Sequence, residues 1–534
     1  MTQLTNDGVT KPGTTIGYDG SRLFFTEGED YGWQIVEVAA AGGDTAPIET
    51  TLPHPWLLDI APDFSGVLAT TDAFHPGPLW WQPLPTGTPR RLEYLEASRA
   101  SFFPDGKHIA YSNSGTGAVG IADRDGSNQQ VLGTVKGRTG TLAISPDGQR
   151  IRFGLQDSMT LSESLWEVDT KSRSLRQLLV GWPGASQVQG GRWTCDGSHF
   201  VFRAGGAGRY DLWALPEKTG FPRRHPVPIR LSNGPISYGF PALSRDGEKI
   251  YAEGIMQRGE LVRFDAGIGQ FVPFLSGLPA IDIAFSKDRK WIAYIAYPDH
   301  TLWRCRADGS NRQQITYPPL EANSVGGISP DDTRVTFDAT VPGSGQSLFI
   351  ASLQNGQPRM LLQRGSGGTW SAEGSALLIS VPKNGLTSGY DGFELQQLDL
   401  SSGRVSSFPD GQSKYPLGWS AQEELVAVDS AFSLQIFSPR TQKWSDLVRG
   451  PCATGRLSPD ARFAYCETSD APYHKIVRVR LSDGRTETVT EVKGLRRVVD
   501  YVLGTTLGVA PDGSVLLTRD LGGEEIYALN IRWP

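Results

Sequence analysis

Three charged residues, Asp59, Arg192 and Arg456, interrupt a column of small side chains that recurs along the chain. The column is the position four residues before the Asp of a Ser-Pro-Asp-Gly type of turn, and small residues fill it at Ser101, Ala143, Ala242, Ala284, Gly327, Thr369, Gly418 and Gly508. Small residues fit where strands crowd near an axis, whereas partly buried charges there need partners or water. The three residues therefore indicate either a tunnel that binds a polar ligand, or an ion pair or solvated tunnel with a structural role.

Two further charged residues are predicted to lie near the axis. Asp282 and Arg99 lie two residues further back in their strands than the column, so they face the same region of the fold. We treat both as additional candidates for binding a ligand in a tunnel.

Residue types and spacing favour a protein without catalytic machinery. The sequence contains no Gly-x-Ser-x-Gly nucleophile motif, and its seven histidines are scattered with no metal-ligand spacing. We therefore predict no catalytic residue, no metal site and no cofactor. Enzymes with tunnel sites need no such motif, so a metal-dependent hydrolase or lactonase-like enzyme stays open as an alternative.

Two of the four cysteines could form a disulfide. Cys452 and Cys466 lie on the two arms of one predicted hairpin, nearly symmetric about its Pro459-Asp460 turn. A cross-strand disulfide is geometrically possible there if the register brings the two residues opposite each other. Such a bond favours an oxidising compartment.

The elements that position these residues repeat with a period of about 45 residues, which is typical of propeller blades. The turn aspartates, or residues in their place, fall at Asp19, Asp63, Asp105, Asp147, Asp196, Asp246, Asp288, Asp331, Glu373, Gln422, Asp460 and Asp512. Apolar and polar residues alternate in short runs on both sides of each turn, which is the strand period. The sequence predicts an all-β propeller of about twelve four-stranded blades.

Twelve blades exceed the four to eight of a typical ring, so we expect two propellers. We place six blades in residues 1–277 and six in residues 278–534, with five plus seven blades or a single ring as alternatives. The last unit ends at its third strand, and residues 2–7 resemble a fourth strand without partners. We expect this amino-terminal strand to complete the last blade, so that one propeller can be discontinuous.

The amino-acid composition limits the classes of partner that the chain can bind. The 51 basic and 57 acidic residues give a net charge of −6, which argues against a nucleic-acid surface. No apolar run is long enough to cross a membrane, and no signal peptide is recognisable. We expect a protein or a small molecule to bind at the loop face or the mouth of a tunnel.

The turn Ser145-Pro-Asp-Gly and the segment from Leu302 to Thr316, LWRCRADGSNRQQIT, resemble the repeat of TolB-type propellers. The segments that begin at Gln3 and Ala510 are similar to the propeller region of acidobacterial winged-helix transcriptional regulators. In that family a winged-helix domain and a membrane helix precede a propeller outside the membrane, but this sequence shows neither.

The resemblance implies an extracytoplasmic or periplasmic sensor domain, excised from a larger regulator, that binds no DNA itself. If the chain is not part of such a regulator, we expect a cytoplasmic location. A plain protein-protein scaffold is a further alternative.

Overall fold

The structure is a computed structural model of the 534-residue chain. It describes residues 1–12, 15–28, 32–73, 75–157, 162–184, 187–206, 208–217, 226–341, 345–354, 356–382, 393–450, 452–468, 474–499 and 505–533. These residues form strands and turns, and none of them lies in a helix that could span a membrane. In this part of the chain the strands build eleven four-stranded antiparallel sheets and one of five strands, so the β-propeller fold predicted from the repeat is confirmed.

The recurring turn has a simple hydrogen-bonded construction. In the turn at Ser145, the hydroxyl donates to Asp147 at 2.5 Å and accepts the backbone N–H of Arg150 at 2.9 Å. Asp147 accepts the N–H of Gln149, and Gly148 has φ +70°, a conformation that favours glycine. The same carboxylate bond, to the N–H two residues on, forms at every turn aspartate from Asp19 to Asp512.

The chain folds into two compact units. Of the described residues, those up to 157, from 162 to 256 and from 522 to 533 form the first unit, and those from 257 to 521 form the second. The boundary that we expected after residue 277 differs from this grouping. The reason is that strands between residues 259 and 273 hydrogen-bond to the second unit.

Five sheets of the first unit follow the chain without interruption. They are β2 (Gly17–Tyr18), β3 (Arg22–Glu27), β4 (Gln34–Ala39) and β5 (Ala46–Pro47); β6 (Trp56–Ile60), β7 (Gly66–Thr70), β8 (Gly77–Pro83) and β9 (Arg90–Ala97); β10 (Arg99–Phe102), β11 (His108–Asn113), β12 (Ala118–Asp123) and β13 (Gln130–Thr134); β14 (Arg138–Ile144), β15 (Arg150–Gln156), β16 (Glu163–Asp169) and β17 (Leu175–Gln177); and β18 (Gln187–Trp193), β19 (His199–Gly206), β20 (Arg209–Pro216) and β21 (Ile229–Arg230).

Five sheets of the second unit are continuous in the same way. They are β27 (Ala280–Phe285), β28 (Trp291–Ala296), β29 (Thr301–Arg306) and β30 (Gln313–Gln314); β31 (Glu321–Ile328), β32 (Arg334–Val341), β33 (Gly345–Ser352) and β34 (Arg359–Gln363); β35 (Ser366–Trp370), β36 (Ala376–Pro382), β37 (Phe393–Asp399) and β38 (Val405–Gln412); β39 (Lys414–Trp419), β40 (Leu425–Asp429), β41 (Leu434–Ser438) and β42 (Lys443–Val448); and β43 (Thr454–Leu457), β44 (Phe463–Glu467), β45 (Lys475–Arg480) and β46 (Thr486–Glu491).

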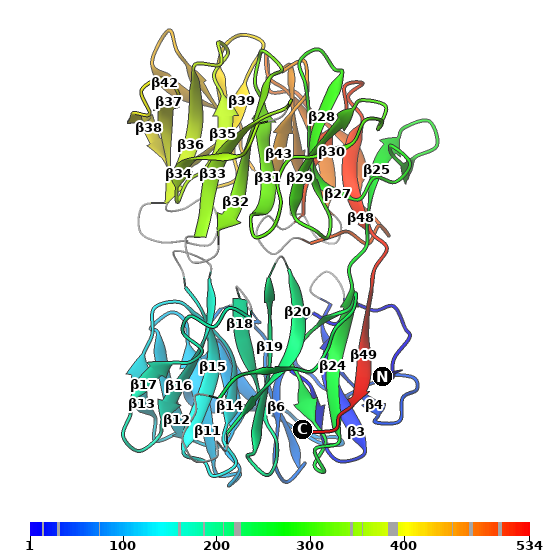
Figure 1. Ribbon diagram of the computed structural model, residues 1–534, viewed down its shortest axis with the longest axis vertical. Coiled ribbons are helices and arrows are strands. Elements are labelled where there is room, and N and C mark those ends of the chain that lie inside the picture. The colour runs from blue at the N-terminus through cyan, green and yellow to red at the C-terminus, as the bar shows by residue number, and fades with distance from the viewer. Residues whose placement is uncertain are drawn as a thin grey trace. The chain divides into compact units, whose positions relative to one another are not determined.

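The sixth sheet of each unit combines strands from distant parts of the sequence. In the first unit β22 (Ser237–Tyr238) and β23 (Ala242–Leu243) pair with β24 (Lys249–Met256), which pairs with β49 (Gly523–Asn530) and then β1 (Thr2–Gln3). In the second unit β47 (Gly508–Val509) and β48 (Val515–Asp520) continue into β25 (Gly259–Asp265) and β26 (Gln270–Pro273). Figure 1 shows β49 beside β24 and β48 beside β25.

This exchange differs from the repeat that we expected at the end of the chain. Residues 2–3 do pair with β49, but β49 belongs to the sheet of β24 and not to that of β47 and β48. Residues 257–258 connect β24 to β25, and residues 521–522 connect β48 to β49. The chain therefore crosses from one unit to the other through two connections of two residues each. The last sequence repeat is therefore divided between two sheets.

The innermost strands of each unit form a closed cycle of neighbours. The cycle runs through β2, β6, β10, β14, β18 and β23 in the first unit, and through β27, β31, β35, β39, β43 and β47 in the second. In the column of small residues, a Cβ added to Gly418 of β39 would lie 2.8 Å from Leu457 Cδ1 in β43, and one added to Gly508 of β47 would lie 2.9 Å from Ile283 Cγ2 in β27. At these two positions the neighbouring inner strand thus leaves little room for a larger side chain.

Candidate functional site

In the first unit, Asp59 and Arg192 form an ion pair across the ring. Asp59 lies on β6 and Arg192 on β18, which are the second and fifth of the six inner strands and therefore lie on opposite sides. Arg192 Nη2 donates to Asp59 Oδ1 at 2.7 Å. The other carboxylate oxygen accepts the hydroxyl of Ser101 and the N–H of Phe102, the latter at 2.9 Å. Asp59 is thereby fully engaged in structural contacts.

In the second unit, Asp282 and Arg456 form the corresponding pair. Arg456 Nη2 donates to Asp282 Oδ1 at 2.5 Å, from β43 to β27. Asp282 Oδ2 accepts the N–H of Val325 at 2.8 Å, and Arg456 Nη1 donates to the carbonyl of the same residue at 3.4 Å. Asp282 is buried, while the Arg456 side chain is one-third exposed. The aspartate raises the pKa of Arg456, and burial opposes this effect only in part.

This second pair lies in the wall of a cavity of about 420 Å³. The wall is built from the inner strands of five sheets and from residues 505–507, which lead into the sixth. Besides the ion pair it includes Asp338, the aromatic residues Phe393, Tyr415 and Phe432, and backbone groups around Gly367. A concave site with a few convergent polar groups among apolar ones is the usual form of a small-molecule site.

Asp338 on β32 is the group in this wall that sequence reasoning missed. Its Oδ2 accepts the Ser324 hydroxyl at 2.9 Å and the N–H of Gly367 at 3.2 Å. The residue is only 1 % exposed, and its Oδ1 is buried without a hydrogen-bond partner. Burial raises the pKa of Asp338 to about 7, and the nearby charge of Asp282 acts in the same direction.

A signal for Asp338 exists in the sequence at a second recurring position. The residue seven places after each turn marker is Thr26, Thr70, Ser112, Gly154, Arg203, Glu253, Ile295, Asp338, Ser380, Asp429, Glu467 and Arg519. This column lies on the second strand of each sheet, beside the start of the inner strand. The predicted candidates all lie on inner strands, whereas Asp338 lies on the neighbouring strand, so it was not predicted.

Arg99 does not join either ion pair. It lies on β10 in the first unit, where Nη1 donates to the carbonyl groups of Ala73 at 3.0 Å and Ser98 at 2.6 Å. Burial lowers its pKa to about 10, and the charge of Arg138 contributes. These contacts give Arg99 a structural role in holding a loop.

Cys452 and Cys466 are joined by a disulfide, with their Cα atoms 4.9 Å apart. The bond connects the residues before β43 to β44, and β43 carries Arg456. A Cβ added to Gly455 would lie 3.0 Å from the Cys452 sulfur, so the bond packs directly against the strand in the cavity wall. The disulfide thus restrains the strand that positions the cationic group of the site.

We expect the C452A/C466A double variant to lower the unfolding free energy of the second unit by about 3 kcal/mol, because the bond closes a loop of 14 residues. The measurement is urea unfolding with and without dithiothreitol. Reductant should bring the unaltered protein to the level of the variant and leave the variant unchanged. Equal stabilities under oxidising conditions would contradict a stabilising bond.

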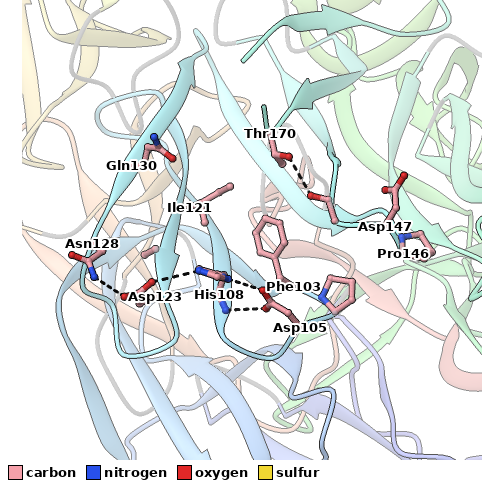
Figure 2. A pocket seen from close by; sticks show the side chains of 13 residues that line it. Phe103, Asp105, His108, Ile121, Asp123, Asn128, Gln130, Pro146, Asp147 and Thr170 are labelled. Atoms are coloured by element: carbon pink, nitrogen blue, oxygen red, sulfur yellow. Dashed lines mark hydrogen bonds and ion pairs between the residues drawn. The ribbon is translucent and has the colours of Figure 1, made fainter. Parts of the chain in front are cut away.

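The first unit has a separate surface groove of about 570 Å³ between two neighbouring sheets. Figure 2 shows His108 between Asp105 and Asp123, with Asn128 bonded to Asp123. Burial would raise the pKa of Asp105, but hydrogen bonds from His108 and from backbone N–H groups outweigh it and keep that pKa below its usual value. Asp105 and Asp147 of this groove accept backbone N–H groups of their own turns.

No group of three or more His, Cys, Asp or Glu side chains in the described ranges could hold a metal ion.

No protein-family model matches the chain, and no curated protein matches it. Among solved structures, a TolB-type protein from Agrobacterium tumefaciens is 15 % identical over 50 % of this chain and 99 % of its own, with a TM-score of 0.40. The tricorn protease is 11 % identical over 92 % of this chain and 63 % of its own, at a TM-score of 0.32. An enzyme named GH74 from Niastella koreensis is 11 % identical over 96 % of this chain and 90 % of its own, with a TM-score of 0.35.

Proposed function

We propose that this chain is a non-enzymatic binding module that recognises a small polar ligand in the cavity of its second unit. We further propose that it acts outside the cytoplasm, as the sensor part of a bacterial transcriptional regulator. Each unit serves as one closed propeller of six blades. The observation that carries the proposal is the cavity with Asp282, Arg456 and Asp338 in its wall.

The contrast between the two units supports this choice of site. The Asp59 carboxylate of the first unit is occupied by Arg192, Ser101 and a backbone N–H. In the second unit the equivalent ion pair leaves an additional buried carboxylate beside it, with an oxygen that has no partner. A buried polar atom without a partner is destabilising, and a bound ligand would remove that cost.

The Cys452–Cys466 disulfide supports the proposed location, because such bonds persist in oxidising compartments. A ligand acts on a regulator only through its different affinities for two states of the protein. The ion pair and the disulfide-restrained strand are the parts of the second unit whose arrangement a ligand in the cavity would bias.

The test is a thermal-shift screen of the full chain against a collection of small polar metabolites. We expect compounds that raise the melting temperature of the unaltered protein to raise it by a different amount in Arg456→Met, where Asp282 in the cavity wall has lost its partner, and by the same amount in Arg192→Met. Arg192→Met removes the matching ion pair of the first unit and serves as the control. Binding that survives Arg456→Met but disappears with Arg192→Met would contradict the proposed site.

A further inference from the structure

At two positions of the column that lies seven residues after each turn aspartate, a single side-chain oxygen links neighbouring sheets. Thr26 Oγ1 accepts the N–H of Leu57 in the next sheet at 2.9 Å. Ser112 Oγ likewise pairs with Thr139 Oγ1 of the next sheet at 2.6 Å. At these positions the side chain links its own sheet to the following inner strand, and one hydroxyl is sufficient.

Asp338 performs this task with Oδ2, which accepts the N–H of Gly367 in the next sheet. Its second oxygen, Oδ1, is therefore not needed for the link between the two sheets. That atom is buried, has no hydrogen-bond partner and belongs to a residue that lines the cavity. A carboxylate oxygen in this state requires a donor that the described protein groups do not supply.

We propose that the cavity of the second unit binds a protonated amine, whose N–H groups donate to Oδ1 of Asp338. This inference rests on the proposed function, since it specifies the ligand of the same site. Among the residues that the structure describes in the cavity wall, three carry formal charge, namely Asp282, Arg456 and Asp338. Asp282 and Arg456 neutralise each other, so an ionised Asp338 leaves one negative charge for the ligand to balance.

The rest of the wall fits an amine with an apolar body. Phe393, Tyr415 and Phe432 all line the same cavity. Aromatic faces attract cations and also cover apolar groups. A carboxylate or phosphate ligand would instead meet Asp338 and find the guanidinium of Arg456 already engaged by Asp282.

The site also predicts the pH dependence of binding. An amine binds best to the ionised carboxylate, and burial places the pKa of Asp338 near 7. The charged groups facing it are Asp282, which raises this pKa, and Arg456, which lowers it; Tyr415 also lines the cavity. The amine must displace a proton from Asp338 below neutral pH, so its affinity rises as the pH increases through 7 and then stays constant until the amine itself loses its proton, at about pH 10.

The experiment uses 4-phenylbutylamine, 4-phenylbutanol and 4-phenylbutyrate, which share one skeleton and differ in the terminal group. Isothermal titration calorimetry measures each with the full chain, with Asp338→Thr and with Asp338→Asn. Asp338→Thr keeps one oxygen for the link to Gly367, as Thr26 does in the first unit. Hydrogen exchange of β32 and β35 peptides verifies that both variants stay folded.

We expect the amine to bind about tenfold or more tightly than the alcohol or the acid, and both variants to lose that preference, since a charge-assisted hydrogen bond disappears. Failure of the amine to bind, or amine binding that both variants leave intact, would overturn the inference. Preferential binding of the acid that depends on Arg456 would overturn the inference while supporting the proposed function.

Discussion

Replacing Lys11 by Met is expected to destabilise the first unit by about 3–5 kcal/mol, because it leaves buried carboxylates without their cation. Lys11 is fully buried, and its Nζ lies 2.6 Å from Asp7 Oδ1 and 2.9 Å from the carbonyl oxygen of Val9. Glu525 Oε2 on β49 lies 3.6 Å away and Glu27 Oε2 on β3 lies 4.0 Å away. This single ammonium group therefore joins the amino-terminal segment to two sheets.

Hydrogen exchange of peptides from β24 and β49, together with urea unfolding, measures this loss. Exposed Lys136 of the same unit provides the control, and Lys136→Met should change stability by less than about 0.5 kcal/mol. Burial raises the pKa of Glu27, so neutralising that residue as well, in K11M/E27Q, should restore part of the loss. Unchanged exchange in β49 of the Lys11→Met variant would show that the cation has no such role.

Asp338 is expected to make the second unit less stable as the pH rises from about 4 to 7. Its pKa is about 7 in the folded protein, against about 3.9 for an unfolded aspartate. Between these values the folded chain holds a proton that the unfolded chain has released, so unfolding releases a proton and a rising pH favours it. The full difference corresponds to about 4 kcal/mol, which is lost by pH 7 and stays lost above it.

Asp338→Asn removes this titration and keeps a side chain of the same size. The variant should match the unaltered protein near pH 4 and exceed its unfolding free energy by about 4 kcal/mol at pH 8. Urea unfolding across this pH range gives the comparison, and Asp59→Asn in the first unit shows how much a paired carboxylate contributes. A difference that does not vary with pH would disprove the raised pKa.

The fold could be predicted because its determinants are local. Each turn depends on a Ser hydroxyl, an Asp carboxylate and a glycine within a few residues, as at Ser145 to Gly148, so a repeated motif identifies repeated hairpins. The candidates Asp59, Arg192, Asp282 and Arg456 were also visible, because each charge appears among small residues near the axis.

The pairings themselves could not be predicted, because they depend on positions around the ring. Asp59 reaches Arg192 on the opposite side, whereas Arg456 reaches Asp282 with only β47 between their strands. Asp338 was missed because its distinguishing feature is one carboxylate oxygen without a hydrogen-bond partner. The number of hydrogen bonds that a side chain makes depends on its three-dimensional surroundings and cannot be read from a sequence. The exchange of strands was missed because β24 and β25 read as consecutive strands of a single blade.

That exchange has a consequence for how the protein forms during synthesis. The described residues of the second unit all lie between Met256 and Gly522, as an insertion within one hairpin of the first. Strand β24 therefore has no partner for its outer edge until β49 leaves the ribosome, after every strand of the second unit. An unpaired edge is prone to associate with other chains. The first unit is thus the first to be translated and the last to close, and chaperone protection of β24 matters most in that interval.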